Sequence, residues 1–175
     1  MPDVLIRTKN ATAQSESSKN HTARKAVDKD KQSTNYFESK KKKGSLPWFQ
    51  IELNKESEVW KVLITNSLKC CDENRDAKTE VRVGNTKIPD EYIGNMTRNV
   101  SDFTSKNGLC GVLTVPTVKD WKNKGTKGER YLINCMKPNN TILKGKYVTL
   151  QSLDPDNVGL HFKEVEVYGK GNKKI

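Results

Sequence analysis

The sequence predicts an all-β fold, an antiparallel β-sandwich of the jelly-roll kind. Segments in which apolar and polar residues alternate recur along the chain, whereas the three- and four-residue spacing of an amphipathic helix does not. These segments are rich in β-branched and aromatic residues, and Gly, Pro, Asn and Asp separate them at intervals typical of a sandwich. We therefore expect half-buried strands at residues 48–53, 59–64, 80–83, 111–115, 130–134, 146–150 and 164–168.

The first three of these segments show the alternation most clearly. Residues 48–53 read Trp-Phe-Gln-Ile-Glu-Leu, residues 59–64 read Val-Trp-Lys-Val-Leu-Ile, and residues 80–83 read Glu-Val-Arg-Val. Successive side chains of a strand point to opposite faces of its sheet. Each segment is therefore expected to bury one face in the core.

The four later segments are shorter or less regular. They read Gly-Val-Leu-Thr-Val, Arg-Tyr-Leu-Ile-Asn, Lys-Tyr-Val-Thr-Leu and Glu-Val-Glu-Val-Tyr. Between them, residues 84–108 and 116–129 are polar enough to be long surface loops. The 175 residues correspond to one domain, expected over residues 1–170, followed by a flexible basic tail at residues 171–175.

The net charge of +11 comes almost entirely from lysine. The chain has 32 Lys and Arg against 21 Asp and Glu, but only six of the basic residues are arginine. Lysine is a hydrated point charge and lacks the planar fork with which arginine reads bases. Together with the lack of clustered stacking aromatics, this argues against nucleic acid as a partner. No run approaches the roughly 18 apolar residues of a membrane span, so an integral membrane protein is not expected.

Cysteines and glycosylation sequons indicate a secreted protein. The chain has four cysteines and five Asn-x-Ser/Thr sequons, at Asn10, Asn20, Asn95, Asn99 and Asn139. Leu, Ile, Val and Phe supply only 22% of the residues, so the lean core is expected to need cross-links or an ion.

Two of the cysteines are adjacent. The Cα atoms of Cys70 and Cys71 are about 3.8 Å apart across a trans peptide, below the usual disulfide range, so a bond between them would be strained. The alternative is that each pairs separately with Cys110 or Cys135. Four cysteines allow three connectivities, and the residues alone leave the choice open.

The chain has few residues that could act as catalytic bases or metal ligands, so an enzyme is not expected. His21 and His161 are the only histidines, and the cysteines lack the spacing of a zinc site. The run Lys40–Lys43 is the densest charge in the chain. It is either a solvated loop or a contact for a polyanion.

Several segments together resemble the F-type lectins, the fucose-binding β-sandwich family typified by eel agglutinin. The most specific element is Cys70-Cys71 between Ile64-Thr65-Asn66 and Arg82-Val83-Gly84. The resemblance also runs through residues 3–7, 11–15, 26–28, 47–53 and 164–167.

The resemblance implies a vicinal Cys70–Cys71 disulfide and a Cys110–Cys135 bridge. A third bridge of the family falls on Lys40 and Lys163, so both of its partners are replaced together. The resemblance also implies a structural calcium ion. Its ligands would be the side chains of Asp28, Ser39 and Glu164 and the carbonyl oxygens of Lys25, Asp30 and Lys163.

The sugar site departs most from the family, which binds fucose through one His and two Arg. Lys42 falls at the His position, Ser67 replaces the first Arg, and Arg75 matches the second only after a one-residue shift that leaves Asn74 at the strict spacing. Ordinary fucose binding is therefore expected to be absent or strongly reduced. The expected ligand-binding residues are Lys41, Lys42, Lys43, Lys69, Cys70, Cys71, Asn74 and Arg75.

These expectations combine into a secreted, non-enzymatic recognition protein that binds an anionic glycan or glycoprotein through a lysine-rich site. Because oyster bindin uses this fold in gametes, and because basic sperm lysins bind egg coats, the resemblance extends to egg-coat recognition. One alternative is a calcium-dependent lectin that still binds fucose through Lys42 and Arg75. Another is a discoidin-like module that binds lipid or protein, with Leu46 and Leu68 as the candidate apolar spikes.

Overall fold

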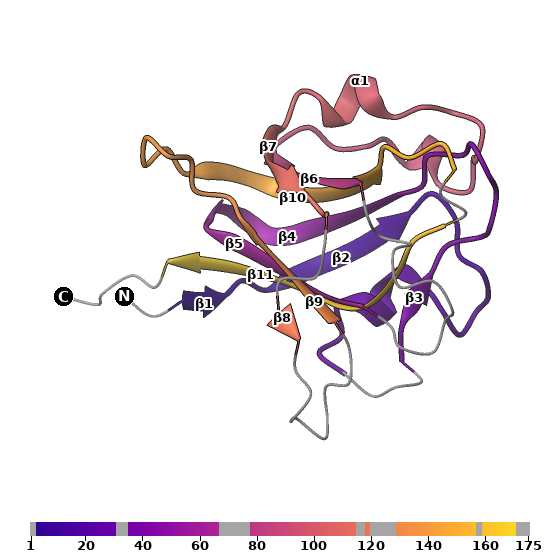
Figure 1. The fold of residues 1–175 in the computed structure, drawn as a ribbon, viewed down its shortest axis with the longest axis horizontal. Helices are drawn as coiled ribbons and strands as arrows, with labels where there is room; N and C mark the ends of the chain where they lie inside the picture. The colour runs from indigo at the N-terminus through magenta and orange to yellow at the C-terminus, as the bar shows by residue number, and fades with distance from the viewer. Residues whose placement is uncertain are drawn as a thin grey trace.

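The structure, a computed structural model, is a sandwich of two antiparallel sheets (Figure 1). It describes residues 3–30, 35–66, 78–114, 118–119, 129–156 and 159–170. One sheet has the strand order β1-β11-β5-β9-β8, with β3 also paired to β11, and the other has the order β2-β4-β10-β6-β7. The all-β sandwich predicted from the sequence is confirmed.

The first sheet is built around the C-terminal strand. Its strands are β1 (Asp3–Leu5), β3 (Phe37–Glu38), β5 (Lys61–Asn66), β8 (Val118–Lys119), β9 (Glu129–Asn134) and β11 (His161–Lys170). Val165 of β11 pairs with Ile64 of β5, and Asp3 of β1 pairs with Lys170. The register therefore places the N-terminal strand beside the last residues of β11.

The second sheet is built around β4 and β10. Its strands are β2 (Thr8–Ala13), β4 (Trp48–Val59), β6 (Thr79–Gly84), β7 (Gly108–Val112) and β10 (Leu143–Ser152). A bulge between Gly145 and Tyr147 lets β10 follow both neighbours. Gly145 is required there, because a Cβ atom would lie 2.3 Å from the carbonyl oxygen of Gly84.

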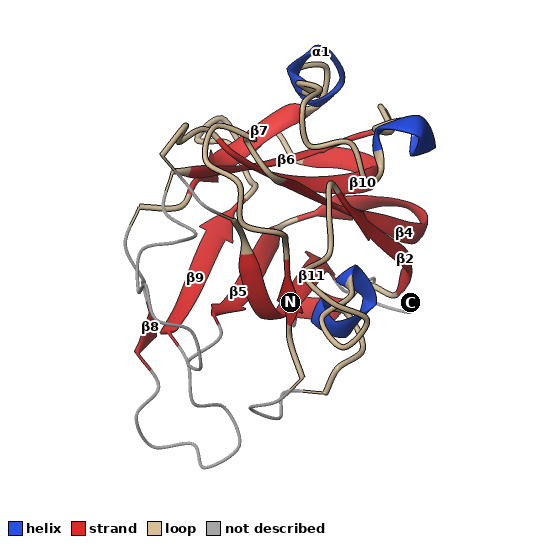
Figure 2. Cartoon of the chain, turned by 90° about the vertical axis from the view of Figure 1, so that its right-hand side faces the viewer, coloured by secondary structure: helices blue, strands red, loops and turns tan. Residues whose placement is uncertain are grey.

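Figure 2 shows the two sheets one above the other. The apolar core cluster takes its buried residues from strands of both sheets. At its centre Phe37, Phe49 and Phe162 pack with ring centroids 5.0–6.0 Å apart. Strands missed by the sequence analysis are β1, β2 and the short β3 and β8. In β2 only Ala11 and Ala13 are buried, so its apolar pattern is weak.

Residues 84–108 are more than the surface loop expected from the sequence. They contain the 3-10 helix η2 (Asp90–Tyr92) and the short helix α1 (Ser101–Thr104), and their apolar side chains form a second cluster with Trp48. This cluster contains Trp48, Ile88, Tyr92, Val100 and, partly buried, Phe103. The expectation of a surface loop was wrong because the few apolar residues of this polar segment pack together with Trp48. Part of the other expected loop, 116–129, lies outside the described residues.

Candidate functional site

One end of the sandwich is formed by loops from both halves of the chain. We call it the loop end and define it as residues 39–47, 94–99 and 153–156. It adjoins the residues where β4 begins and β10 ends, since Trp48 pairs with Gln151. The loop end lies at the right of Figure 1, opposite the N- and C-termini, and faces the viewer in Figure 2.

The run Lys40–Lys43 is exposed at the loop end. Backbone hydrogen bonds hold it at both sides: the Lys40 N–H donates to Ser15 Oγ at 3.0 Å, and the Gly44 N–H donates to the Pro155 carbonyl at 2.8 Å. Lys43 Nζ lies 3.4 Å from a carboxylate oxygen of Asp156. The expected ligand residues Lys41, Lys42 and Lys43 are thus together on one anchored surface loop.

Gln14, just after β2, connects this loop to a second one. Its side-chain Nε2 donates to the main-chain carbonyl of Ser45 at 2.7 Å. Its main-chain carbonyl accepts from the Gly94 N–H at 2.7 Å. The residue is fully buried, so water does not compete for these bonds. The lysine loop and the loop 94–99 are therefore held at a fixed separation.

A cleft of about 200 Å³ lies between these two loops. Its lining residues are Lys42, Lys43, Gly44, Ser45, Leu46, Met96, Thr97, Arg98 and Asn99. Leu46 is partly buried in this lining and has a left-handed backbone, with φ of 46°. It is therefore not an apolar spike of the sort that the discoidin-like alternative needs.

Arg98 is the charged residue of this cleft that the sequence analysis missed. Its guanidinium carbon lies 4.0 Å from the centroid of the Tyr92 ring, and its Nη2 donates to the Tyr92 hydroxyl at 3.0 Å. Nη1 is 4.0 Å from Glu91 Oε1. The sequence showed Tyr92 and Arg98 six residues apart in a polar segment, and no spacing rule predicted that contact.

The other expected ligand residues cannot be placed at the loop end. Lys69, Cys70, Cys71, Asn74 and Arg75 lie outside the described residues, as do Ser67 and Leu68. The fucose-type arrangement, the vicinal disulfide and its alternatives at Cys70 and Cys71 therefore stay predictions.

The expected calcium ligands lie in η1 (Ala23–Ala26) and the residues directly after it, at Ser39 directly after β3, and on β11. The Lys29 N–H donates to Glu164 Oε1 at 3.1 Å, which ties the segment after η1 to the final strand. Asn35 Nδ2 lies 2.9 Å from both carboxylate oxygens of Asp28 and 3.0 Å from the Asp30 carbonyl. Three oxygens thus converge on one donor position.

This donor set has the chemistry that a calcium ion prefers, because all of its atoms are oxygen. Ser39 and Glu164 are buried, and Ser39 Oγ accepts the Leu160 N–H at 2.8 Å. Within the described residues, no three side chains of His, Cys, Asp or Glu gather closely enough to hold a metal. A calcium ion here would therefore need the carbonyl and hydroxyl oxygens of Lys25, Asp30, Ser39 and Lys163 as well as two carboxylates.

Lys163 places a buried amino group beside the same segment. The residue is 2% exposed, and burial lowers the pKa of its ammonium group, an effect that nearby Asp30 opposes. Lys40, which shares with Lys163 the two positions where the resembled family has its third bridge, is exposed. The two lysines are thus in very different surroundings.

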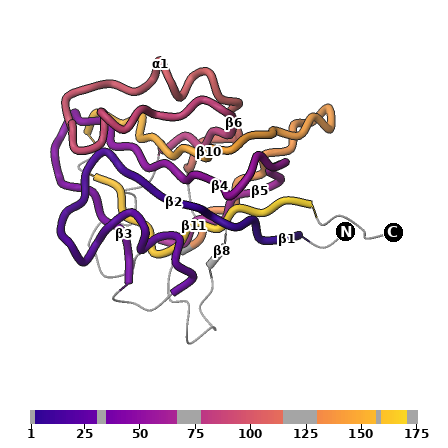
Figure 3. Tube along the Cα trace, turned by 180° about the vertical axis from the view of Figure 1, so that it is seen from behind, coloured from indigo at the N-terminus to yellow at the C-terminus, as the bar shows by residue number. Residues whose placement is uncertain are grey.

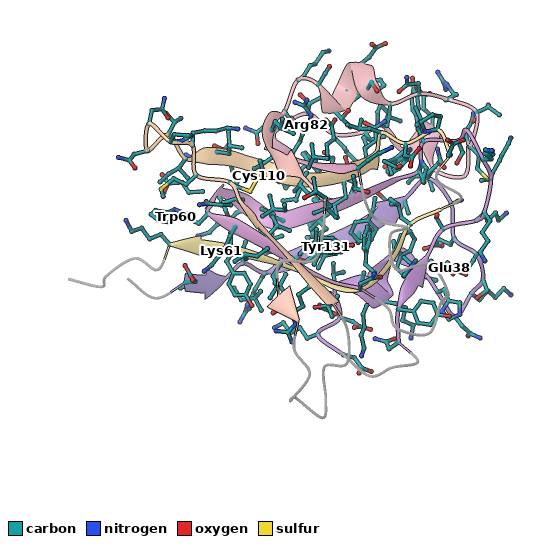
Figure 4. The ribbon with its side chains drawn as sticks, viewed as in Figure 1. Glu38, Trp60, Lys61, Arg82, Cys110 and Tyr131 are labelled. Atoms are coloured by element: carbon teal, nitrogen blue, oxygen red, sulfur yellow. A yellow bond between two sulfur atoms is a disulfide. The ribbon has the colours of Figure 1, made fainter. Side chains whose placement is uncertain are left out.

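The Cys110–Cys135 disulfide is present and joins the two sheets (Figure 4). Cys110 lies in β7 and Cys135 directly follows β9, 25 residues later. Cys135 is fully buried in the core. This pairing, one of those implied by the resemblance, is confirmed.

The two histidines occupy unrelated places. His21 stacks on Tyr36 with ring centroids 4.0 Å apart, and His161 is fully buried at the start of β11. None of the helices in the described part of the chain is long and apolar enough to cross a membrane.

Comparison with solved structures identifies the fold. A fucolectin, an F-type lectin from striped bass serum, matches 95% of this chain with a TM-score of 0.68 and 22% identity; this chain spans 49% of that protein's length. A fucose-binding module from Streptococcus pneumoniae matches 98% of this chain and 100% of its own, with a TM-score of 0.62 and 17% identity. A family 32 carbohydrate-binding module of C. perfringens NanJ, solved with galactose, covers 96% and 100%, with a TM-score of 0.63 and 13% identity.

No protein-family model and no curated protein matches the chain. The structural similarities show that it has the F-type lectin fold, which it shares with discoidin-like carbohydrate-binding modules.

Proposed function

We propose that this chain is a secreted, non-enzymatic glycan-recognition domain that binds an anionic glycan or glycoprotein at its loop end. The observation that carries the proposal is the anchored run of four exposed lysines, Lys40–Lys43, on a fold shared with a fucose-binding module and a carbohydrate-binding module solved with galactose. An acidic glycoprotein of an egg coat is one partner of this class.

The chemistry of lysine supports an anionic partner over a neutral sugar. A lysine ammonium attracts carboxylates and sulfates over a distance but lacks the fixed donor geometry that grips ring hydroxyls. Because these lysines are exposed, salt screens their attraction with a Debye length of about 8 Å at physiological ionic strength. Binding through them should therefore weaken as salt rises.

Calcium has a structural part in this proposal. The oxygens of Asp28, Ser39 and Glu164, with the carbonyls of Lys25, Asp30 and Lys163, would hold the ion between the 25–39 segment and β11. Bound there, the ion would supply charge neutralisation and a cross-link. The Lys29-to-Glu164 hydrogen bond already brings the two elements together.

A glycan array run with and without calcium, at low and physiological salt, tests the function. We expect binding to sulfated or sialylated glycans that weakens at physiological salt. The variant Lys41→Gln/Lys42→Gln should lose this binding, whereas a control with the same loss of charge, Lys55→Gln/Lys106→Gln, should keep it; all four lysines are exposed.

Two outcomes of the array would contradict the proposal. Salt-insensitive binding to neutral fucosides would instead support a fucose lectin. Equal losses in the two double variants would show that net charge, and not the loop end, determines binding.

A further inference from the structure

The cleft between residues 42–46 and 96–99 has the size of a subsite. Ligand pockets that enclose a whole drug-sized molecule have volumes of about 300–1,000 Å³. At about 200 Å³ this cleft is smaller. It suits one substituent of a larger ligand that extends across the surface.

Arg98 supplies a cationic group with a fixed orientation. Stacking on Tyr92 and the hydrogen bond from Nη2 to the Tyr92 hydroxyl hold the guanidinium in place, while its side chain stays 46% exposed. Within the described residues it makes no other hydrogen bond, and Glu91 is 4.0 Å from Nη1. Its remaining N–H groups can therefore form the paired hydrogen bonds that carboxylates and sulfates accept.

Ser45 provides a second indication of a ligand. The residue lines the cleft and is 7% exposed, and among the described residues its Oγ has no hydrogen-bond partner. Buried hydroxyl groups in folded proteins are almost always hydrogen-bonded. A ligand atom or a water in the cleft would supply the missing partner.

The local charges favour an anion. Lys42, Lys43 and Arg98 line the cleft, and its lining includes no Asp or Glu. Asp156 lies close to Lys43, and Glu91 lies close to Arg98.

We propose that this cleft binds a single anionic substituent of a glycan, a sulfate ester or a carboxylate, through Arg98 and Lys42. The proposal rests on the proposed function, since it assigns the charged part of the glycan to a defined place at the loop end. It differs from the lysine-run interpretation because its main contact is an oriented arginine outside that run.

Equilibrium binding of three glycan probes to four proteins tests the subsite. The probes are chondroitin sulfate, hyaluronan, which carries carboxylates but no sulfates, and a neutral fucosylated oligosaccharide. The proteins are wild type, Arg98→Gln, Lys42→Gln and the control Arg24→Gln, which removes an exposed arginine of η1. We expect Arg98→Gln to weaken anionic binding about tenfold, Lys42→Gln to weaken it less, and Arg24→Gln to leave it near wild type.

Preference between the two anionic probes identifies the substituent. Binding of chondroitin sulfate alone would assign a sulfate ester, and equal binding of hyaluronan would assign a carboxylate. Equal affinities for Arg98→Gln and Arg24→Gln would overturn the subsite while leaving the proposed function standing. Because Lys42 is an exposed surface side chain, its variant reports on the cleft even if Arg98→Gln folds poorly.

A titration with sodium sulfate separates the two proposals further. The readout is the NMR signal of the Arg98 Nε–H, and the control is a titration with sodium chloride at equal ionic strength. A saturable shift specific to sulfate supports the subsite even where no glycan probe binds, an outcome that would overturn the proposed function alone. No sulfate-specific shift, together with no effect of Arg98→Gln, would overturn the subsite.

Discussion

The side-chain Nε2 of Gln14 donates a 2.7 Å hydrogen bond to the main-chain carbonyl of Ser45. This bond joins the end of β2 to the loop that carries the lysine run. Replacing Gln14 with Met keeps the volume but leaves the buried carbonyl without its donor. We expect the free energy of unfolding to fall by about 1–3 kcal/mol, and trypsin to cleave faster after Lys40–Lys43.

Gln50→Met is the matched control for this variant. Gln50 is also buried, and its Oε1 accepts from the Ile88 N–H at 2.7 Å, on the segment 84–108. It should lose similar stability without faster cleavage in the lysine run. Equal cleavage rates for the two variants would show that Gln14 does not hold that loop.

The Cys110–Cys135 bridge should be a main source of stability for this lean core. It closes a loop of about 25 residues between the two sheets. The chain-entropy account gives about 3.5 kcal/mol for a loop of this length. Urea unfolding of Cys110→Ser/Cys135→Ser should show that loss, whereas Cys70→Ser/Cys71→Ser should lose much less. A loss below about 1 kcal/mol in the first variant would contradict this account.

Calcium should raise the thermal midpoint of unfolding. An ion that binds only the folded chain at a concentration 100 times its Kd stabilises it by about 2.7 kcal/mol. We expect a chelator to lower the midpoint of wild type but not that of Glu164→Gln, and magnesium to restore it poorly. A wild-type midpoint that does not respond to chelator would rule out the structural calcium.

The lowered pKa of Glu52 predicts that the stability of the fold depends on pH. Burial alone would raise the pKa of Glu52, but the hydrogen bond from Lys146, together with Lys9, lowers it overall. Glu52 therefore contributes stability above its unfolded pKa, and that contribution is lost as the pH falls through its lower folded pKa. Because both lysines are partly exposed, we expect at most about 1 kcal/mol.

Thermal melts of wild type and Glu52→Gln from pH 3 to 7 measure this effect. The difference in midpoint should be largest near pH 6 and should shrink as the pH falls through the lowered folded pKa of Glu52. A difference that stays constant across this range would mean that Glu52 acts by packing and not by charge.

The fold could be predicted because its central strands carry their own pattern. In β4 and β11, alternation and β-branched residues make the element visible without knowledge of its neighbours. Strand β2, Thr-Lys-Asn-Ala-Thr-Ala, could not be recognised in this way, because it buries only two alanines and its pairing with β4 is not visible in its own sequence.

The candidate site could be predicted only where charge is consecutive. Lys40–Lys43 is visible in the sequence as a run, but the cleft depends on contacts between residues far apart, such as Gln14 with Ser45. Arg98 becomes a candidate ligand-binding residue only in the structure, where its guanidinium stacks on the Tyr92 ring. Tyr92 is in turn packed with Trp48 in the second apolar cluster.

The pairing of Asp3 with Lys170 has a practical consequence for presentation of the domain. The two ends of the described chain lie side by side, on the side away from the loop end (Figures 1 and 3). Near them, Lys170 Nζ lies 4.3 Å from the centroid of the Trp60 ring, and Trp60 and Lys61 mark this side in Figure 4. A tag, a solid surface or a second copy of the domain attached at either terminus would leave the run Lys40–Lys43 of each copy exposed at the opposite end. Tandem copies could therefore engage a clustered anionic surface with the gain in avidity that simultaneous contacts give.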